Sequence, residues 1–164
     1  MKTVALTMIV KNEEKVLARC LDSVRKLVDE IIIVDTGSTD RTKSIAQAYG
    51  AKIYDWAWNQ SFADARNAAL EHSTSDWNLV LDADEYVKSE DGAAIRQFIN
   101  GEKAIGRFKI INQFIGDDGL ESTAQSFISR IFRPESDTRA ASMNNWFPIF
   151  PELSCLWRFG TMVI

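Results

Sequence analysis

The chain has 164 residues, of which 46% are hydrophobic and 26% are charged, and these proportions are typical of one soluble globular domain. A net charge of −4, with no cluster of lysine and arginine, argues against a surface that binds nucleic acid. No apolar run approaches the roughly 18 residues that a membrane-spanning helix needs. We therefore expect a cytoplasmic protein with at most peripheral contact with the inner face of the membrane.

The first part of the chain alternates between strand-like and helix-like patterns. Apolar, largely β-branched runs predict four strands, and these lie at residues 4–10, 30–35, 51–54 and 77–81. Apolar residues recur at helical spacing after each of them, with Ser61 placed to cap one helix and Gly50 placed to end another. Four strand–helix units with short connections predict an α/β fold with a doubly wound, mostly parallel sheet flanked by helices.

The pattern then changes. Alternating runs at residues 106–111 and 126–132 flank a Gly-Asp-Asp-Gly sequence, which predicts an antiparallel hairpin in the C-terminal part of the sheet, at its far edge. All three prolines follow, from Pro134 onward, among aromatic residues and without periodicity. We therefore divide the chain into a core of residues 1–133 and an atypical tail of residues 134–164. Truncation or a shifted reading frame is our hypothesis for this tail, whose aromatic residues would favour a homo-oligomer.

Three acids follow the fourth predicted strand, at Asp82, Asp84 and Glu85. Open α/β sheets bind ligands beyond the carboxyl ends of their strands, so Asp82 and Asp84 are placed to face one ligand. Carboxylates in that position suit Mg²⁺ or Mn²⁺, and such a cation suits a diphosphate. The alternative interpretation is that these acids only solvate a turn.

Other strand ends carry polar residues that fit the same kind of ligand. Asn12 and Glu14 follow the first strand, Asp35 ends the second, and Arg66 lies on the helix before the fourth. For each residue taken alone, a polar turn, a helix cap or a solvated helix face is the favoured explanation. Together they indicate a nucleotide site, because a carboxylate can accept from a base N–H or a ribose hydroxyl while an arginine offsets phosphate charge.

In their order along the chain, four motifs resemble those of the family 2 glycosyltransferases, which have the GT-A fold. The matching text is MIVKNEE, IIVDTGSTDRT, FADARN and LDADE, at residues 8–14, 32–42, 62–67 and 81–85. The sequence is most similar to a bacterial branch that includes lipopolysaccharide core-type transferases and peptide S-glycosyltransferases. The resemblance covers the core and implies a hexosyltransferase-type enzyme. Its reaction would move a sugar from a nucleoside-diphosphate sugar, in particular a UDP-sugar, to a glycan, lipid or peptide, with inversion at the anomeric carbon.

The resemblance also implies roles for the residues of the nucleotide site. Asp35 would contact the uracil or equivalent base, and Arg66 would lie near the base and the diphosphate. Val10, Asn12 and Glu14 would line the nucleoside pocket. The core would therefore be a GT-A catalytic domain that binds the nucleotide-sugar donor.

The resemblance also implies a metal-binding role for the Asp-Ala-Asp sequence at residues 82–84. Asp82 would meet the ribose side of the nucleotide, and Asp84 would hold the Mg²⁺ or Mn²⁺ that bridges the two phosphates, with Asp82 as a second candidate ligand. In an inverting displacement the leaving diphosphate gains charge, which a bound cation stabilises.

The general base that deprotonates the acceptor is where the sequence departs from the family. The branch carries a His-Glu pair beyond the stretch that matches residues 130–134, and this chain has none there. We interpret the one histidine, His72, as a surface residue. The remaining candidates for the general base are Glu85, which follows Asp84, and Asp117 or Asp118, in the hairpin turn. The alternative function is a non-catalytic nucleotide-sugar-binding module or a truncated donor-binding half.

Overall fold

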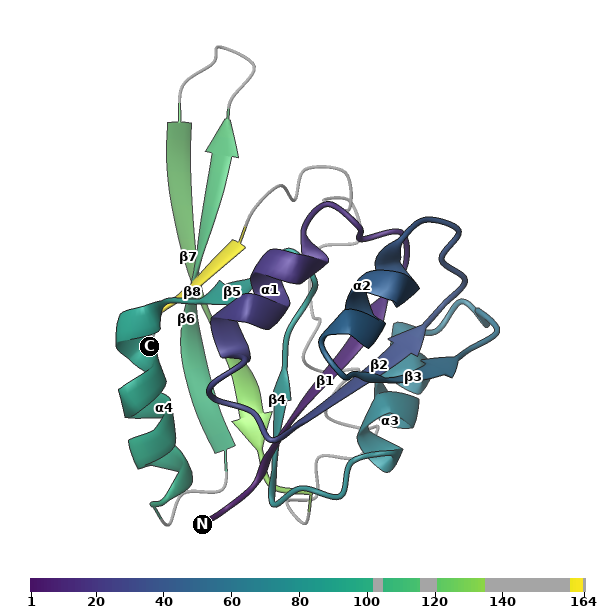
Figure 1. The fold of residues 1–164 in the computed structure, drawn as a ribbon. Coiled ribbons are helices and arrows are strands. Elements are labelled where there is room, and N and C mark those ends of the chain that lie inside the picture. The colour runs from purple at the N-terminus through teal and green to yellow at the C-terminus, as the bar shows by residue number, and fades with distance from the viewer. Residues whose placement is uncertain (102–104, 116–120, 135–159, 164) are drawn as a thin grey trace.

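The computed structural model describes residues 1–101, 105–115, 121–134 and 160–163, which form one mixed sheet with helices on both faces (Figure 1). Its eight strands lie in the order β3-β2-β1-β4-β7-β6-β8-β5. The strands are β1 Val4–Val10, β2 Glu30–Asp35, β3 Lys52–Asp55, β4 Trp77–Val80, β5 Tyr86–Val87, β6 Ile105–Ile115, β7 Glu121–Phe132 and β8 Gly160–Val163. The helices are α1 Leu17–Val24, α2 Thr42–Ala48, α3 Phe62–Glu71 and α4 Gly92–Ile99, with a 3-10 helix η1 at Ser89–Asp91.

The N-terminal half of the sheet is parallel, as the alternating pattern predicts. β1 pairs with β2 on one side and with β4 on the other, and β2 pairs with β3. Ser61 accepts a hydrogen bond from the Asp64 amide and caps α3, and Gly50 follows α2 with a φ of +75°, so both predicted helix boundaries are confirmed. The carboxyl ends of β1, β2 and β4 therefore meet at one edge of the sheet.

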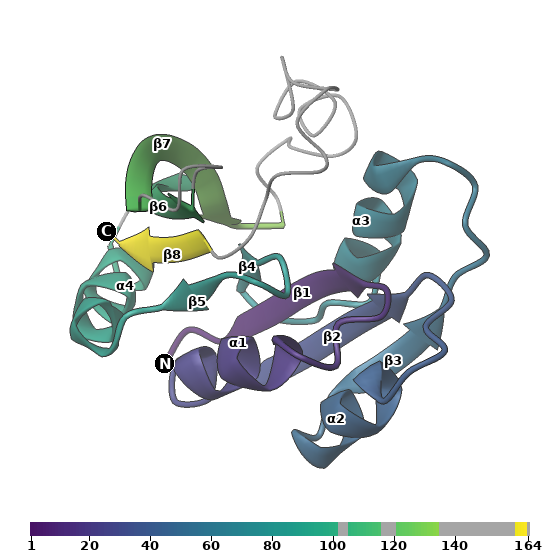
Figure 2. The ribbon, with the colours of Figure 1, turned by 90° about the horizontal axis from the view of Figure 1, so that it is seen from above.

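Successive residues of β1 face two different cores, because side chains alternate across a strand. Val4, Leu6 and Met8 are buried in a large core that includes residues of α1, α2 and α4. Ala5 is buried in a smaller core with three alanines of α3. Figure 2 shows α1 and α2 on one side of the parallel strands and α3 on the other. Both faces of β1 are thus covered, which explains its nearly continuous apolar sequence.

The C-terminal half of the sheet is antiparallel around the predicted hairpin. β7 pairs with β4, and β6 pairs with β7 along its length. The hairpin is not at the edge, however, since β8 and then β5 lie beyond it. Neither strand was predicted, because β5 has two residues and β8 falls in the tail that lacks periodicity. Residues 135–159 and the turn with Asp117 and Asp118 lie outside the described residues, so the boundary at residue 134 stays a prediction.

Within the described ranges, no helix combines the length and apolar character needed to cross a bilayer.

Gly106 marks a close contact between the hairpin and α4. A Cβ atom at this position would lie 2.5 Å from Cγ2 of Ile131 and 2.9 Å from Cε1 of Phe98. Ile131 is fully buried, and the register of β6 against β7 shifts between Gly106 and Arg107. The absence of a side chain at Gly106 therefore lets α4 pack on the sheet.

We expect Gly106→Ala to lower the free energy of unfolding by about 1–3 kcal/mol, because overpacking a filled core costs this much. Urea denaturation followed by circular dichroism measures the change. Gly92→Ala is the matched control, since a Cβ there meets nothing within 4 Å. Equal denaturation midpoints for the two variants would show that the contact at Gly106 is not tight.

Candidate functional site

The chain leaves β4 and makes a tight turn at residues 82–85. The Glu85 amide donates to the Asp82 carbonyl at 3.0 Å, and the Asp82 amide donates to Oε2 of Glu85 at 2.9 Å. Between these ends, the carbonyl of Asp84 accepts from Nη2 of Arg19, on α1, at 2.9 Å. We call residues 82–85 the acidic turn. Its backbone is held by the Glu85 side chain, which belongs to the turn itself, and by Arg19, which reaches it from α1.

Two buried arginines hold the Asp82 carboxylate. Nη2 of Arg66, on α3, lies 2.6 Å from Oδ1, and Nη2 of Arg130, on β7, lies 3.1 Å from Oδ2. Arg66 and Arg130 are 8% and 5% exposed. Burial alone would raise the pKa of Asp82, but the two guanidinium groups hold it well below its usual range. Both oxygens of Asp82 are thus paired with arginine while its side chain stays 35% exposed, and the predicted role of Asp82 beside the ligand stays a prediction.

Glu85 is also part of this ion-pair network. Its Oε1 lies 2.5 Å from Nη2 of Arg130, its Oε2 accepts from the Asp82 amide, and the residue is 6% exposed. Burial raises the pKa of Glu85 to about 7, although the charge of Arg130 acts in the opposite direction. The sequence offered Glu85 as a candidate general base, and in the structure its carboxylate is already paired with Arg130 and with the Asp82 amide.

Glu13 is a half-buried carboxylate that the sequence analysis did not select as a candidate. Burial raises the pKa of Glu13, and the charges of Asp84, Asp40 and Asp82 raise it further. Burial and the charge of Asp82 likewise raise the pKa of Asp84. Carboxylates that lie near one another disfavour each other's ionisation, which accounts for the direction of both shifts.

The backbone between β1 and α1 explains why Glu13 was missed. Asn12 has a φ of +57°, a left-handed conformation that asparagine tolerates better than most residues. Glu14 accepts from the backbone amide of Arg41 at 3.1 Å and forms a salt bridge with its Nε at 3.3 Å. The sequence distinguishes Glu13 only by its place between Asn12 and Glu14, which were both predicted to line the nucleoside pocket.

Asn12 and Glu14 join the loop after β1 to the loop after β2. Oδ1 of Asn12 accepts from the Thr39 amide at 2.8 Å, and the Asn12 amide donates to Oγ of Ser38 at 2.9 Å. Val10, which was predicted to line a nucleoside pocket, is buried and pairs in register with Asp35. These three predicted residues are thus brought next to Asp35, where they hold the two loops in place.

Asp35 carries an unsatisfied buried acceptor. Its Oδ2 accepts from the amides of Gly37 and Ser38 at 3.0 and 2.9 Å, and Nζ of Lys43 lies 3.7 Å from the same oxygen. Gly37 has a φ of +104°, a conformation that glycine adopts without strain. Asp35 is 1% exposed, and Oδ1 has no hydrogen-bond partner among the described residues. Such an orphan acceptor is rare in folded proteins and calls for a donor from elsewhere.

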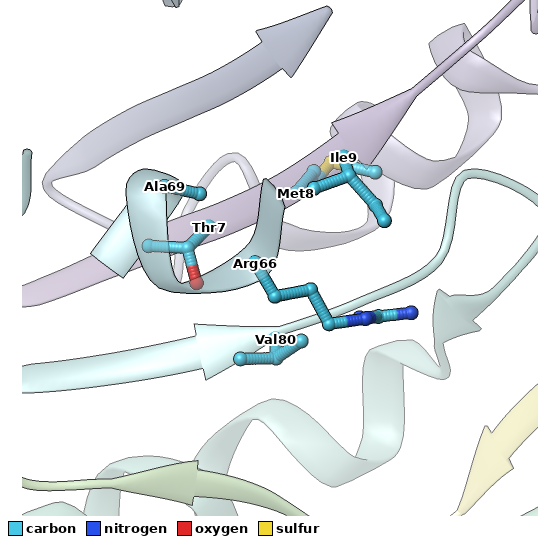
Figure 3. A pocket seen from close by; sticks show the side chains of 6 residues that line it. All are labelled: Thr7, Met8, Ile9, Arg66, Ala69 and Val80. Atoms are coloured by element: carbon cyan, nitrogen blue, oxygen red, sulfur yellow. The ribbon is translucent and has the colours of Figure 1, made fainter. Parts of the chain in front are cut away.

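Arg66 reaches the acidic turn from the opposite side of the sheet to α1. A shallow recess is lined by Thr7, Met8, Ile9, Arg66, Ala69 and Val80. Figure 3 shows the Arg66 side chain running past Val80 with its guanidinium group beyond the end of β4. His72, in contrast, is exposed at the end of α3 and stacks on Tyr54. The structure therefore gathers the predicted site residues into two groups, one at the acidic turn and one at Asp35, and leaves His72 outside both.

Arg130 is the second residue that sequence reasoning missed. It lies within an alternating strand-like run, where a charged residue normally points to solvent. Its burial follows from the pairing of β7 with β4, in which Ile131 lies opposite Leu79.

Residues 6–156 match the family model described as Glycosyl transferase family 2. A TPR repeat-containing protein of Synechococcus elongatus is 40% identical over 139 residues, which are 85% of this chain and 34% of that protein. An uncharacterised glycosyltransferase of Rickettsia typhi is 39% identical over 90 residues, covering 55% of this chain and 30% of its own. The glycosyltransferase SunS of Bacillus subtilis is 36% identical over 95 residues, covering 57% and 22%. The chain thus spans about a third of the length of the first two relatives.

Solved structures share the fold. Glucosyl-3-phosphoglycerate synthase from Mycobacterium tuberculosis superposes with a TM-score of 0.53 at 24% identity, over 63% of this chain and 43% of the synthase. A structure of that synthase with Mn²⁺ and UDP-glucose gives a TM-score of 0.51 at 23% identity, over 63% and 42%. These likenesses establish the GT-A fold. Because the match to the family model spans most of the sequence, this chain belongs to glycosyl transferase family 2.

Proposed function

We propose that this chain is the donor-binding catalytic core of an inverting glycosyltransferase, which moves a sugar from a UDP-sugar to a glycan, lipid or peptide acceptor with the help of Mg²⁺ or Mn²⁺. The observation that carries the proposal is that Asp35, at the carboxyl end of β2, and the acidic turn after β4 meet at one edge of the parallel strands. Asp84 follows β4, which pairs with β1, and β1 pairs in turn with β2. Asp84 therefore lies at the same edge of the sheet as Asp35. This edge is where open α/β sheets bind their ligands.

The Asp35 end of the site fits a nucleobase. A carboxylate only accepts hydrogen bonds, so Oδ1 requires a donor such as the ring N–H of uracil. Its other oxygen is already held by two backbone amides and faces Lys43. The orientation of Oδ1 is therefore fixed before any ligand arrives, which lowers the cost of ordering on binding.

The acidic turn fits the diphosphate end. Asp84 is a half-buried carboxylate at the end of the parallel strands, and a carboxylate together with the oxygens of a diphosphate is a usual ligand set for Mg²⁺. We propose Asp84 as the direct metal ligand and assign Asp82, with both oxygens held by arginine, to keeping the turn in place. When bound, the cation stabilises charge on the leaving diphosphate.

A non-catalytic nucleotide-sugar-binding module, or a donor-binding half, is the alternative. It is favoured by the enclosure of Glu85, the candidate base that lies among the described residues. Release of UDP from UDP-glucose, with and without added acceptors, separates the two functions. Donor binding without any release of UDP would favour the module.

We expect Asp84→Asn to remove most of the gain in UDP affinity that Mn²⁺ provides, by roughly tenfold or more, because the neutral amide is a poorer ligand for a hard cation. Calorimetric titration with UDP, in Mn²⁺ and in EDTA, measures this gain. Asp22→Asn, on the exposed surface of α1, is the control. An unchanged gain in the Asp84 variant would assign the metal to another residue.

We expect Asp35→Asn to weaken UDP binding equally with and without Mn²⁺, by about tenfold, because an amide N–H would then face the N–H of the base across an unpaired contact. The same titrations report it, and the ratio of the two affinities stays at the wild-type value. Asp55→Asn is the matched control, since Asp55 is exposed and pairs with the same lysine. A loss confined to the Mn²⁺ titration would contradict a base contact.

A further inference from the structure

Arg130 is a buried cation that arrives at the acidic turn from the hairpin. It precedes the two residues of β7 that pair with β4. A single nitrogen, Nη2, lies within 3.1 Å of Asp82 and 2.5 Å of Glu85, the first and last residues of the turn. One guanidinium group therefore connects both ends of the segment that carries Asp84.

Arg130 holds the Glu85 carboxylate, and that carboxylate in turn holds the backbone of Asp82. The carboxylate of Glu85 accepts from the Asp82 amide, so a change in its position would release that end of the turn. Among the described residues, Arg130 is the cation that forms an ion pair with Glu85. Removing one member of a buried ion pair leaves the other charge uncompensated, and such a charge moves toward solvent or is neutralised.

We propose that Arg130 is a positioning residue that locks the acidic turn and so presents the Asp84 carboxylate to the metal and diphosphate of the donor. This inference rests on the proposed function. Arg130 touches neither ligand, and it acts through Asp82 and Glu85. The competing account is that the ion pairs only stabilise the fold.

The first test is titration of the 164-residue chain with UDP, in MnCl₂ and in EDTA. Substituting a residue that orients a metal ligand typically costs about 10–100-fold in metal affinity, so we expect Arg130→Met to reduce the Mn²⁺-dependent gain in UDP affinity at least about tenfold. Affinity in EDTA stays within about twofold of wild type, and Arg130→Lys recovers part of the gain because it keeps the charge.

Arg107→Met is the matched control. Arg107 is exposed on β6 and donates to the carbonyl of Phe127 at 3.1 Å. This variant keeps the wild-type gain. Equal losses with and without Mn²⁺ in Arg130→Met, or no loss, would overturn the positioning role. If Arg130→Met does not fold, Arg130→Lys and Glu85→Gln carry the same comparison, since each weakens the clamp while keeping its shape.

Hydrogen exchange provides a second test that needs no ligand. The amides of Asp82 and Glu85 close the turn, so we expect Arg130→Met to lower their protection at least about tenfold while amides of β1 and β2 keep theirs. Unchanged protection at these two amides overturns the inference. If the wild type shows no Mn²⁺-dependent binding of UDP, the proposed function fails, and exchange alone then decides whether Arg130 holds the turn.

Discussion

The acidic turn depends on the ion pairs that Asp82 forms with two buried arginines, Arg66 and Arg130. Burying an arginine is costly unless its charge is paired, and here Arg66 and Arg130 each pair with a separate oxygen of the half-buried Asp82. Arg66 comes from α3 and Arg130 from β7, on different sides of β4. The network is complete only when helix, central strand and hairpin are all in place. The acidic turn therefore takes its shape only when these three elements are packed together.

The two ends of the site are held by different interactions. At the Asp35 end, hydrogen bonds between Asn12 and the residues Ser38 and Thr39, together with the exposed Glu14–Arg41 salt bridge, join the loops after β1 and β2. At the acidic turn, buried ion pairs take that role. This division explains why motif residues such as Asn12 and Glu14 make contacts within the protein. These contacts set the shape of the two loops beside Asp35.

Local patterns were sufficient for the parallel half of the fold, because strand runs, Ser61 and Gly50 each carry their own signal. They were insufficient where structure depends on distant pairing. The burial of Arg130 follows from contact between β7 and β4, which no local period encodes. The contact of Glu14 with Arg41 joins two loops that are distant in sequence, which the polar stretch alone does not predict. β5 has only two residues and exists because the sheet offers it a partner in β8.

The enclosure of Glu85 is consistent with the stereochemistry of an inverting transfer. In such a reaction the acceptor attacks from the face opposite the leaving group, so the base that takes its proton lies across the sugar from the diphosphate. A residue adjacent to Asp84 would stand on the leaving-group side, together with the cation. A proton acceptor there would not reach the attacking hydroxyl. In an inverting transfer the base would therefore belong to a segment that approaches the donor from the far side, whereas both oxygens of Glu85 are hydrogen-bonded within the acidic turn and to Arg130.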